Sequence, residues 1–62
     1  SRMDRVVEMK DKSINIIDYK TGIEKDEDIL QVEKYKNVLK EIEDKNITAY
    51  LIYIDLNKIV KV

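Results

Sequence analysis

Residues 16–22, with the sequence IIDYKTG, place a carboxylate and an ammonium two positions apart at the end of an apolar run. Successive side chains of a β-strand point to opposite faces, so Asp18 and Lys20 would share one face and Tyr19 would lie on the other. Together they could hold a divalent cation and orient a water, which is the chemistry of metal-dependent phosphodiester hydrolysis. In the structural alternative, Asp18 faces solvent or caps the turn, and Lys20 is an edge-strand charge that discourages aggregation.

A second carboxylate, Asp4, lies in residues 3–9, which alternate as a strand does and would form a hairpin with residues 13–20. With an odd loop length, Asp4 falls opposite Asp18 or one step away on the same face, whereas a two-residue loop puts them on opposite faces. A shared metal requires paired residue numbers with an even sum, for instance Asp4 opposite Asp18. Two carboxylates paired across strands repel, and a cation turns the pair into a ligand set.

A helix is expected over residues 28–44, where apolar residues recur at helical spacing. Its predicted N-cap is Asp26 or Asp28, and Asp28 with Gln31 has the form of a capping box. Gln31 and Tyr35 are four residues apart, so they share one helix face. They could reach a phosphate or a metal-bound water from there. A capping glutamine and a core tyrosine explain the same spacing equally well.

The other elements follow from turn residues and apolar runs. Residues 21–27 form a polar loop that contains the only glycine. Residues 48–54 are almost wholly apolar, typical of a central strand covered on both faces, and residues 58–62 form a short last strand. The order β-β-α-β-β predicts an α+β or α/β fold with a mixed sheet and one helix on one face. Because one helix covers one face, we expect a larger domain or a homodimer to cover the other.

Composition limits the kinds of site that the chain can form. Its 62 residues make one domain at most, with no Cys and no His, which excludes disulfides and Cys/His zinc sites. Any metal would be a hard ion such as magnesium, manganese or calcium. The formal net charge of −1 is not that of a globally basic nucleic-acid binder. No apolar run approaches a membrane span, so we expect a soluble, cytoplasmic protein without membrane partners.

The chain resembles the PD-(D/E)xK nuclease superfamily, and within it the RecB/AddAB-type branch, in the segments RMDRV (2–6), IIDYKTG (16–22) and QVEKY (31–35). This branch comprises nuclease domains attached to recombination helicases and related CRISPR-associated exonucleases. The family fold begins with a helix that carries an acidic or His ligand, and usually another strand follows it. The resemblance therefore implies that residues 1–62 are one partial domain: a restriction-endonuclease-like core that lacks the N-terminal helix.

The resemblance also implies a function, namely metal-dependent cleavage of DNA by an exonuclease or endonuclease domain in recombination or repair. Asp4 and Asp18 would hold one or two Mg²⁺ or Mn²⁺ ions, and Lys20 would position the attacking water. Gln31 and Tyr35 would contact the nucleic-acid backbone or orient that water. DNA and a helicase domain or subunit are the implied partners.

Two other functions fit the sequence. The chain could be a catalytically inactive nuclease fold that serves as a structural or protein-interaction module. It could also be a small α+β assembly domain in which the motifs arise by chance. Because the helix-borne ligand is absent from these 62 residues, we expect the isolated chain to cut DNA weakly or not at all.

Overall fold

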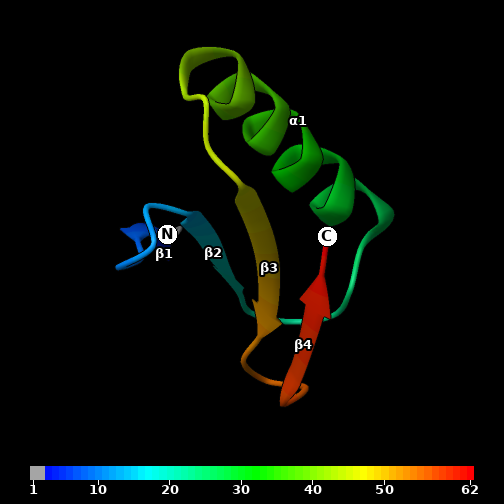
Figure 1. Cartoon of the computed structure of the whole chain (residues 1–62). Coiled ribbons are helices and arrows are strands. Elements are labelled where there is room, and N and C mark those ends of the chain that lie inside the picture. The colour runs from blue at the N-terminus through cyan, green and yellow to red at the C-terminus, as the bar shows by residue number, and fades with distance from the viewer. Residues whose placement is uncertain (1–2) are drawn as a thin grey trace.

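The computed structural model describes residues 3–62, and Arg2 of the RMDRV segment lies outside them. The elements follow the expected β-β-α-β-β order (Figure 1), with boundaries within two residues of those predicted. The bounds are β1 (Met3–Glu8), β2 (Ile14–Lys20), α1 (Asp26–Ile42), β3 (Ile47–Tyr53) and β4 (Lys58–Lys61). Within the described range, α1 is neither long nor apolar enough to cross a membrane.

The four strands form one mixed sheet in the order β1-β2-β3-β4. The outer pairs, β1 with β2 and β3 with β4, are antiparallel, and the inner pair β2 and β3 is parallel. A parallel pair needs a long crossover connection, which α1 provides. The helix lies on one side of the sheet beside β3 and the end of β4 (Figure 1), where Lys36 Nζ donates to the Val62 carbonyl oxygen at 3.3 Å. The predicted α+β fold is confirmed.

The turn between β1 and β2 sets the register of the hairpin. Met9 N–H donates to the Ser13 carbonyl oxygen at 2.8 Å, which leaves a three-residue loop of residues 10–12. Lys12 closes this loop in the left-handed region, at φ 74°, as three-residue hairpin loops commonly require. The Asp11 carboxylate accepts hydrogen bonds from the Ser13 hydroxyl and N–H, which lower the pKa of Asp11. An odd loop length is what a metal shared by Asp4 and Asp18 would require.

The resulting register pairs Asp4 with Asp18, and Val6 with Ile16. Directly opposed residues of an antiparallel pair project to the same face of the sheet. The hairpin therefore has the parity that a metal shared by Asp4 and Asp18 would require.

The hydrophobic core lies between the sheet and α1. Along β3, buried residues alternate with half-buried ones, so the expectation that both faces of this strand are covered is wrong. Tyr50 and Ile52 are apolar but face the side away from the helix, where they are half-buried by their neighbours in the sheet. Residues that form the buried cluster are Ile14, Ile16, Val32, Ile47, Ala49, Leu51 and Tyr53.

The start of α1 differs from the expected cap. Its N-cap is Lys25, in an extended conformation, and Asp28 is the third helical residue. The Asp28 carboxylate accepts the Lys25 N–H at 3.0 Å, so the capping box spans Lys25 and Asp28, not Asp28 and Gln31. Three acidic residues occupy the first turn, where they complement the positive end of the helix dipole. The helix therefore begins at Asp26, so both of the expected capping residues lie inside its first turn.

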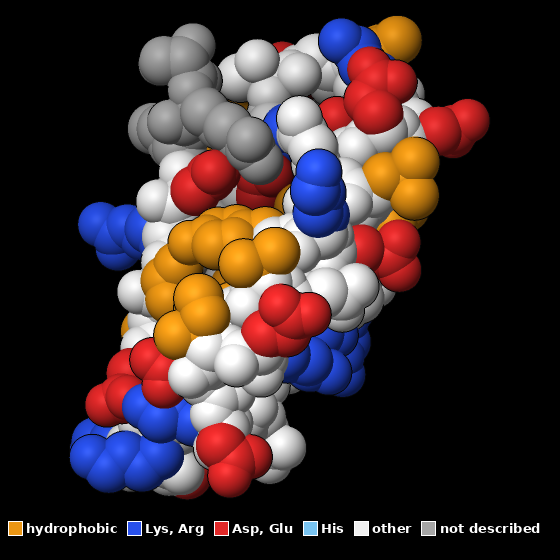
Figure 2. Space-filling model, turned by 90° about the horizontal axis from the view of Figure 1, so that it is seen from above, with side chains coloured by type: hydrophobic (Ala, Val, Ile, Leu, Met, Phe, Trp, Pro, Cys, Tyr) orange, Lys and Arg blue, Asp and Glu red, His pale blue; other side chains and the backbone are white. Residues whose placement is uncertain are grey.

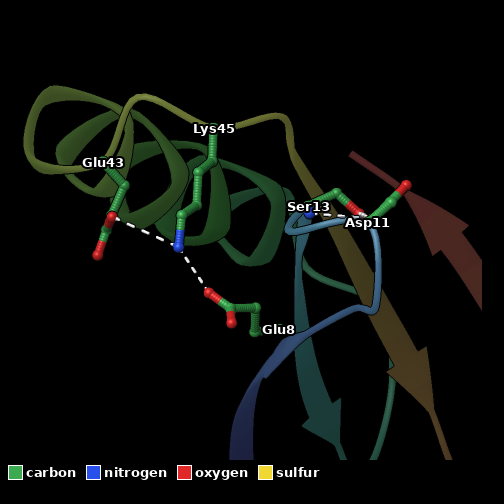
Figure 3. Close-up of polar contacts among 5 residues, drawn as sticks. All are labelled: Glu8, Asp11, Ser13, Glu43 and Lys45. Carbon is green, nitrogen blue, oxygen red and sulfur yellow. Dashed lines mark hydrogen bonds and ion pairs between the residues drawn. The ribbon is translucent and has the colours of Figure 1, made fainter.

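A salt bridge ties the far end of the hairpin to the segment after α1. Lys45 Nζ lies 2.5 Å from a Glu8 carboxylate oxygen and 3.9 Å from one of Glu43 (Figure 3). The hydrogen bond from Lys45 lowers the pKa of Glu8, and the same bond raises the pKa of Lys45. This contact fixes the end of the sheet that lies opposite to Asp18 and Lys20.

Candidate functional site

Asp18 and Lys20 lie at the end of β2, on the face of the sheet that α1 covers. In the parallel register they are the partners of Leu51 and Tyr53, both of which are core residues. Asp18 is only 1% exposed, so it does not face solvent. Lys20 Nζ lies 3.5 Å from an Asp18 carboxylate oxygen. The predicted carboxylate–ammonium pair is therefore present, and β2 is an inner strand rather than an edge.

Asp4 brings a second carboxylate to this end of the sheet. It is exposed on β1 and stands opposite the buried Asp18. Cβ atoms of directly opposed residues are typically about 4.5–5.5 Å apart, a separation that one cation can bridge through two carboxylates. The pair therefore combines a desolvated carboxylate, held in place by the sheet, with one that solvent can reach.

The helix contributes Gln31 to the same site. Its carboxamide oxygen accepts a hydrogen bond from Lys20 Nζ at 3.2 Å. Lys20 thus lies between Asp18 and Gln31, which places the predicted amide next to the predicted ammonium. Tyr35 is one turn further along α1 and 40% exposed, and among the described residues it has no side-chain hydrogen bond. The structure therefore brings Gln31 into the site and leaves Tyr35 at its edge.

Two further residues at the site were not expected from the sequence. The Tyr53 hydroxyl donates a hydrogen bond to the Asp28 carboxylate at 3.0 Å, and both side chains are buried. Burial is the largest cause that raises the pKa of Tyr53 to about 12, followed by its hydrogen bond to Asp28. The apolar pattern of β3 made Tyr53 look like an ordinary core residue. The hydroxyl of Tyr53, at the end of an apolar strand, was the only sign in the sequence that this residue has a polar role.

Ionisation of Tyr53 is expected to destabilise the protein at high pH. Its pKa is raised from 10.0 to about 12 in the folded state, so the contribution of this group to stability is complete below pH 10. It is then lost as the pH rises from 10 to 12, because the unfolded chain releases the phenolic proton first. Urea unfolding at several pH values measures how the free energy of unfolding changes between pH 10 and pH 12. Tyr53→Phe should weaken this pH dependence. An unchanged dependence would contradict the raised pKa of Tyr53.

The loop that follows Lys20 is held by contacts with the β3–β4 turn. Gly22 N–H donates to the Asp55 carboxylate at 2.6 Å, and Gly22 has a φ of 80°, which side chains rarely tolerate. Lys58 Nζ lies 2.6 Å from a Glu24 carboxylate oxygen. The chain therefore passes from β2 to the helix along a fixed path, although Asp55 carried no recognisable sequence signal.

A hard cation requires oxygen ligands, which carboxylates supply. No group of three or more potential ligands occurs among the described residues, and the candidate site offers the two carboxylates of Asp4 and Asp18. Magnesium commonly binds through one or two carboxylates, with water and substrate phosphate completing its coordination. The two opposed carboxylates fit this requirement.

The surface carries no extended basic tract on the face shown in Figure 2, where lysine and arginine side chains are interspersed with acidic ones around an apolar patch. Two surface hollows of about 330 and 490 Å³ lie near the β1–β2 turn, at the opposite end of the sheet from Asp18. Neither contains Asp4, Asp18 or Lys20. Affinity for a phosphate at the candidate site would therefore depend on local charges.

Comparisons with models of protein families, with curated proteins and with solved structures found no match. The likeness to PD-(D/E)xK nucleases therefore rests on the three short segments of the sequence. A function for the chain depends on the residues and the geometry described above.

Proposed function

We propose that this chain belongs to a metal-dependent nuclease of the RecB/AddAB type and hydrolyses phosphodiester bonds in DNA. The observation that supports this most is the hairpin register, which places Asp4 opposite Asp18. Lys20 lies 3.5 Å from Asp18 on the same face, as the D-x-K motif requires. A recombination or repair helicase is the partner that the resemblance suggests.

Asp4 and Asp18 are the proposed ligands of a Mg²⁺ or Mn²⁺ ion. When bound, such an ion polarises a phosphate and lowers the pKa of a coordinated water. The buried Asp18 keeps its orientation because its strand lies inside the sheet, and this reduces reorganisation during the reaction. Because Asp4 is exposed, a phosphate could approach an ion held by this pair from solvent.

Lys20 is the proposed stabiliser of negative charge on the phosphate. Its ammonium is fixed by Asp18 on one side and by the Gln31 carboxamide at 3.2 Å on the other. A donor that is already oriented gains strength in a partly desolvated site as the phosphate becomes more negative. Tyr35, 40% exposed one turn beyond Gln31, would contact the nucleic-acid backbone.

Manganese binding tests the proposed ligand pair directly. We expect the chain to bind Mn²⁺, and Asp18→Asn or Asp4→Asn to abolish that binding, because an amide is a poor ligand for a hard cation. Electron paramagnetic resonance of free Mn²⁺ measures the bound fraction. Asp44→Asn is the matched control, since this exposed carboxylate lies far from the site along the chain. Binding that survives loss of Asp18 would rule out the shared site.

The second candidate function is an inactive nuclease fold used as a structural module. It is favoured by the contacts of Lys20, whose links to Asp18 and Gln31 join β2 to α1 without any catalytic role. A module of this kind would bind no Mn²⁺ at Asp18, so the same titration separates the two functions.

A further inference from the structure

A buried hydrogen bond joins the end of β3 to the first turn of α1. The Tyr53 hydroxyl donates to an Asp28 carboxylate oxygen at 3.0 Å, and the same oxygen accepts the Lys25 N–H at 3.0 Å. Tyr53 is 1% exposed and Asp28 is 6% exposed. Burying a carboxylate costs free energy that an apolar pair would not require. In return, a hydrogen bond fixes a direction as well as a distance between the helix and the strand.

This bond belongs to a closed ring of contacts between two strand residues, Tyr53 and Lys20, and two helix residues, Asp28 and Gln31. Tyr53 is the partner of Lys20 in the parallel register, and Gln31 follows Asp28 by three residues on the same side of α1. The hydrogen bond from Lys20 Nζ to Gln31 Oε1, at 3.2 Å, closes this ring. The Tyr53–Asp28 bond and the Lys20–Gln31 bond thus join the sheet and the helix side by side.

We propose that Tyr53 and Asp28 are a positioning pair for Lys20, which they orient by holding Gln31 against it. The proposal rests on the proposed function, because it assigns the pair a purpose in the reaction of Lys20. Neither residue would touch the substrate. Their effect would pass through the first turn of α1.

The packing of α1 explains why this one bond matters. Asp28 and Val32 are the buried residues of α1, a helix that the structure describes over its whole length. If the bond is lost, Val32 still holds the middle of the helix on the sheet, but the first turn loses its polar anchor. We therefore expect the first turn to fray and Gln31 to leave Lys20, while the fold persists.

Tyr53→Phe tests the proposal, since it removes the hydroxyl and keeps the ring in the core. Gln31 is the single glutamine of the chain, so its side-chain amide gives one assignable pair of NMR signals. In Tyr53→Phe these signals should move to their positions in Lys20→Met, which lacks the donor. In cleavage assays of the full protein, kcat should fall about tenfold and KM should change less than about twofold, as misplacement of a catalytic group predicts.

Two other variants complete the experiment. Tyr50→Phe is the matched control on the open face of the same strand and should leave the Gln31 signals and kcat unchanged. Asp28→Ala removes the same hydrogen bond from the helix side and should reproduce Tyr53→Phe. It also gives an answer if Tyr53→Phe does not fold.

The outcomes separate this proposal from the function on which it rests. Gln31 signals that stay at their wild-type positions in both Tyr53→Phe and Asp28→Ala would overturn the positioning pair, whether or not the protein cuts DNA. If the signals move as expected but the wild-type protein cuts nothing, the contact between Gln31 and Lys20 still depends on the pair. The proposed nuclease function is then the part that fails.

Discussion

Asp18→Asn is expected to abolish DNA cleavage by the full protein, with a loss on the order of 10³-fold or more. The reason is the loss of a carboxylate ligand with almost no change in shape. The stability of the metal-free protein should stay the same or rise by about 0.5–1 kcal/mol, because relief of the repulsion from Asp4 and of the cost of burying a charge offsets the weaker contact with Lys20. A carboxylate with a purely structural role would behave differently. Its loss would cost about 1–3 kcal/mol and leave activity largely intact.

Nuclease assays and thermal melting of this single variant measure both quantities. Asp44→Asn provides the comparison, since it removes one exposed negative charge away from the site and should change neither activity nor melting temperature. A destabilised Asp18→Asn that still cuts DNA would remove Asp18 from the proposed ligands.

Leu51→Ala is expected to unfold most of the protein at room temperature. Leu51 is 0% exposed and is the strand partner of Asp18 in the middle of the core. Replacing a buried leucine by alanine typically costs about 2.7–5 kcal/mol. A core of this size rarely supplies more than about 3–5 kcal/mol of net stability. The substitution therefore removes most or all of the stability, and cleavage should disappear together with the fold.

Circular dichroism and urea unfolding report the loss of Leu51. The matched control is Leu30→Ala, because Leu30 is 63% exposed on the helix and alanine is a good helix former. Leu30→Ala should change the free energy of unfolding by less than about 0.5 kcal/mol. A cooperative Leu51→Ala transition at the wild-type midpoint would contradict the assigned core. The contrast with Asp18→Asn is informative, since only Leu51→Ala should lose activity through loss of the fold.

The sequence could show which hairpin registers bring Asp4 and Asp18 to one face, because side-chain direction in a strand has a period of two, but it left the loop length open. Parity alone then decides whether Asp4 and Asp18 share a face, and the observed pairing of Asp4 with Asp18 is one of those registers. The surroundings of β3 could not be inferred in the same way. Tyr50 and Ile52 are apolar, but composition does not distinguish a half-buried open face from a covered one.

The contacts of the helix were less predictable for a different reason. The parallel register of β2 and β3 depends on the length of the whole crossover, so no local pattern pairs Lys20 with Tyr53. The hydrogen bond between Tyr53 and Asp28 joins residues 25 positions apart. The spacing of Gln31 fitted a place near the strand ends and a capping role equally well, and its acceptance of a hydrogen bond from Lys20 needed the structure.

The left-handed Lys12 in the β1–β2 turn has a consequence for how this sequence can change over time. Glycine or asparagine would adopt its φ of 74° with less strain than lysine, so position 12 can change to either residue without loss of the turn. The parity of the loop length is more constrained. Inserting or deleting one residue in this loop would turn Asp4 to the opposite face of the sheet. Asp4 lies about 20 Å from the loop, near the far end of β1. A change of loop length by one residue would therefore disturb the candidate site more than a substitution of Lys12 would.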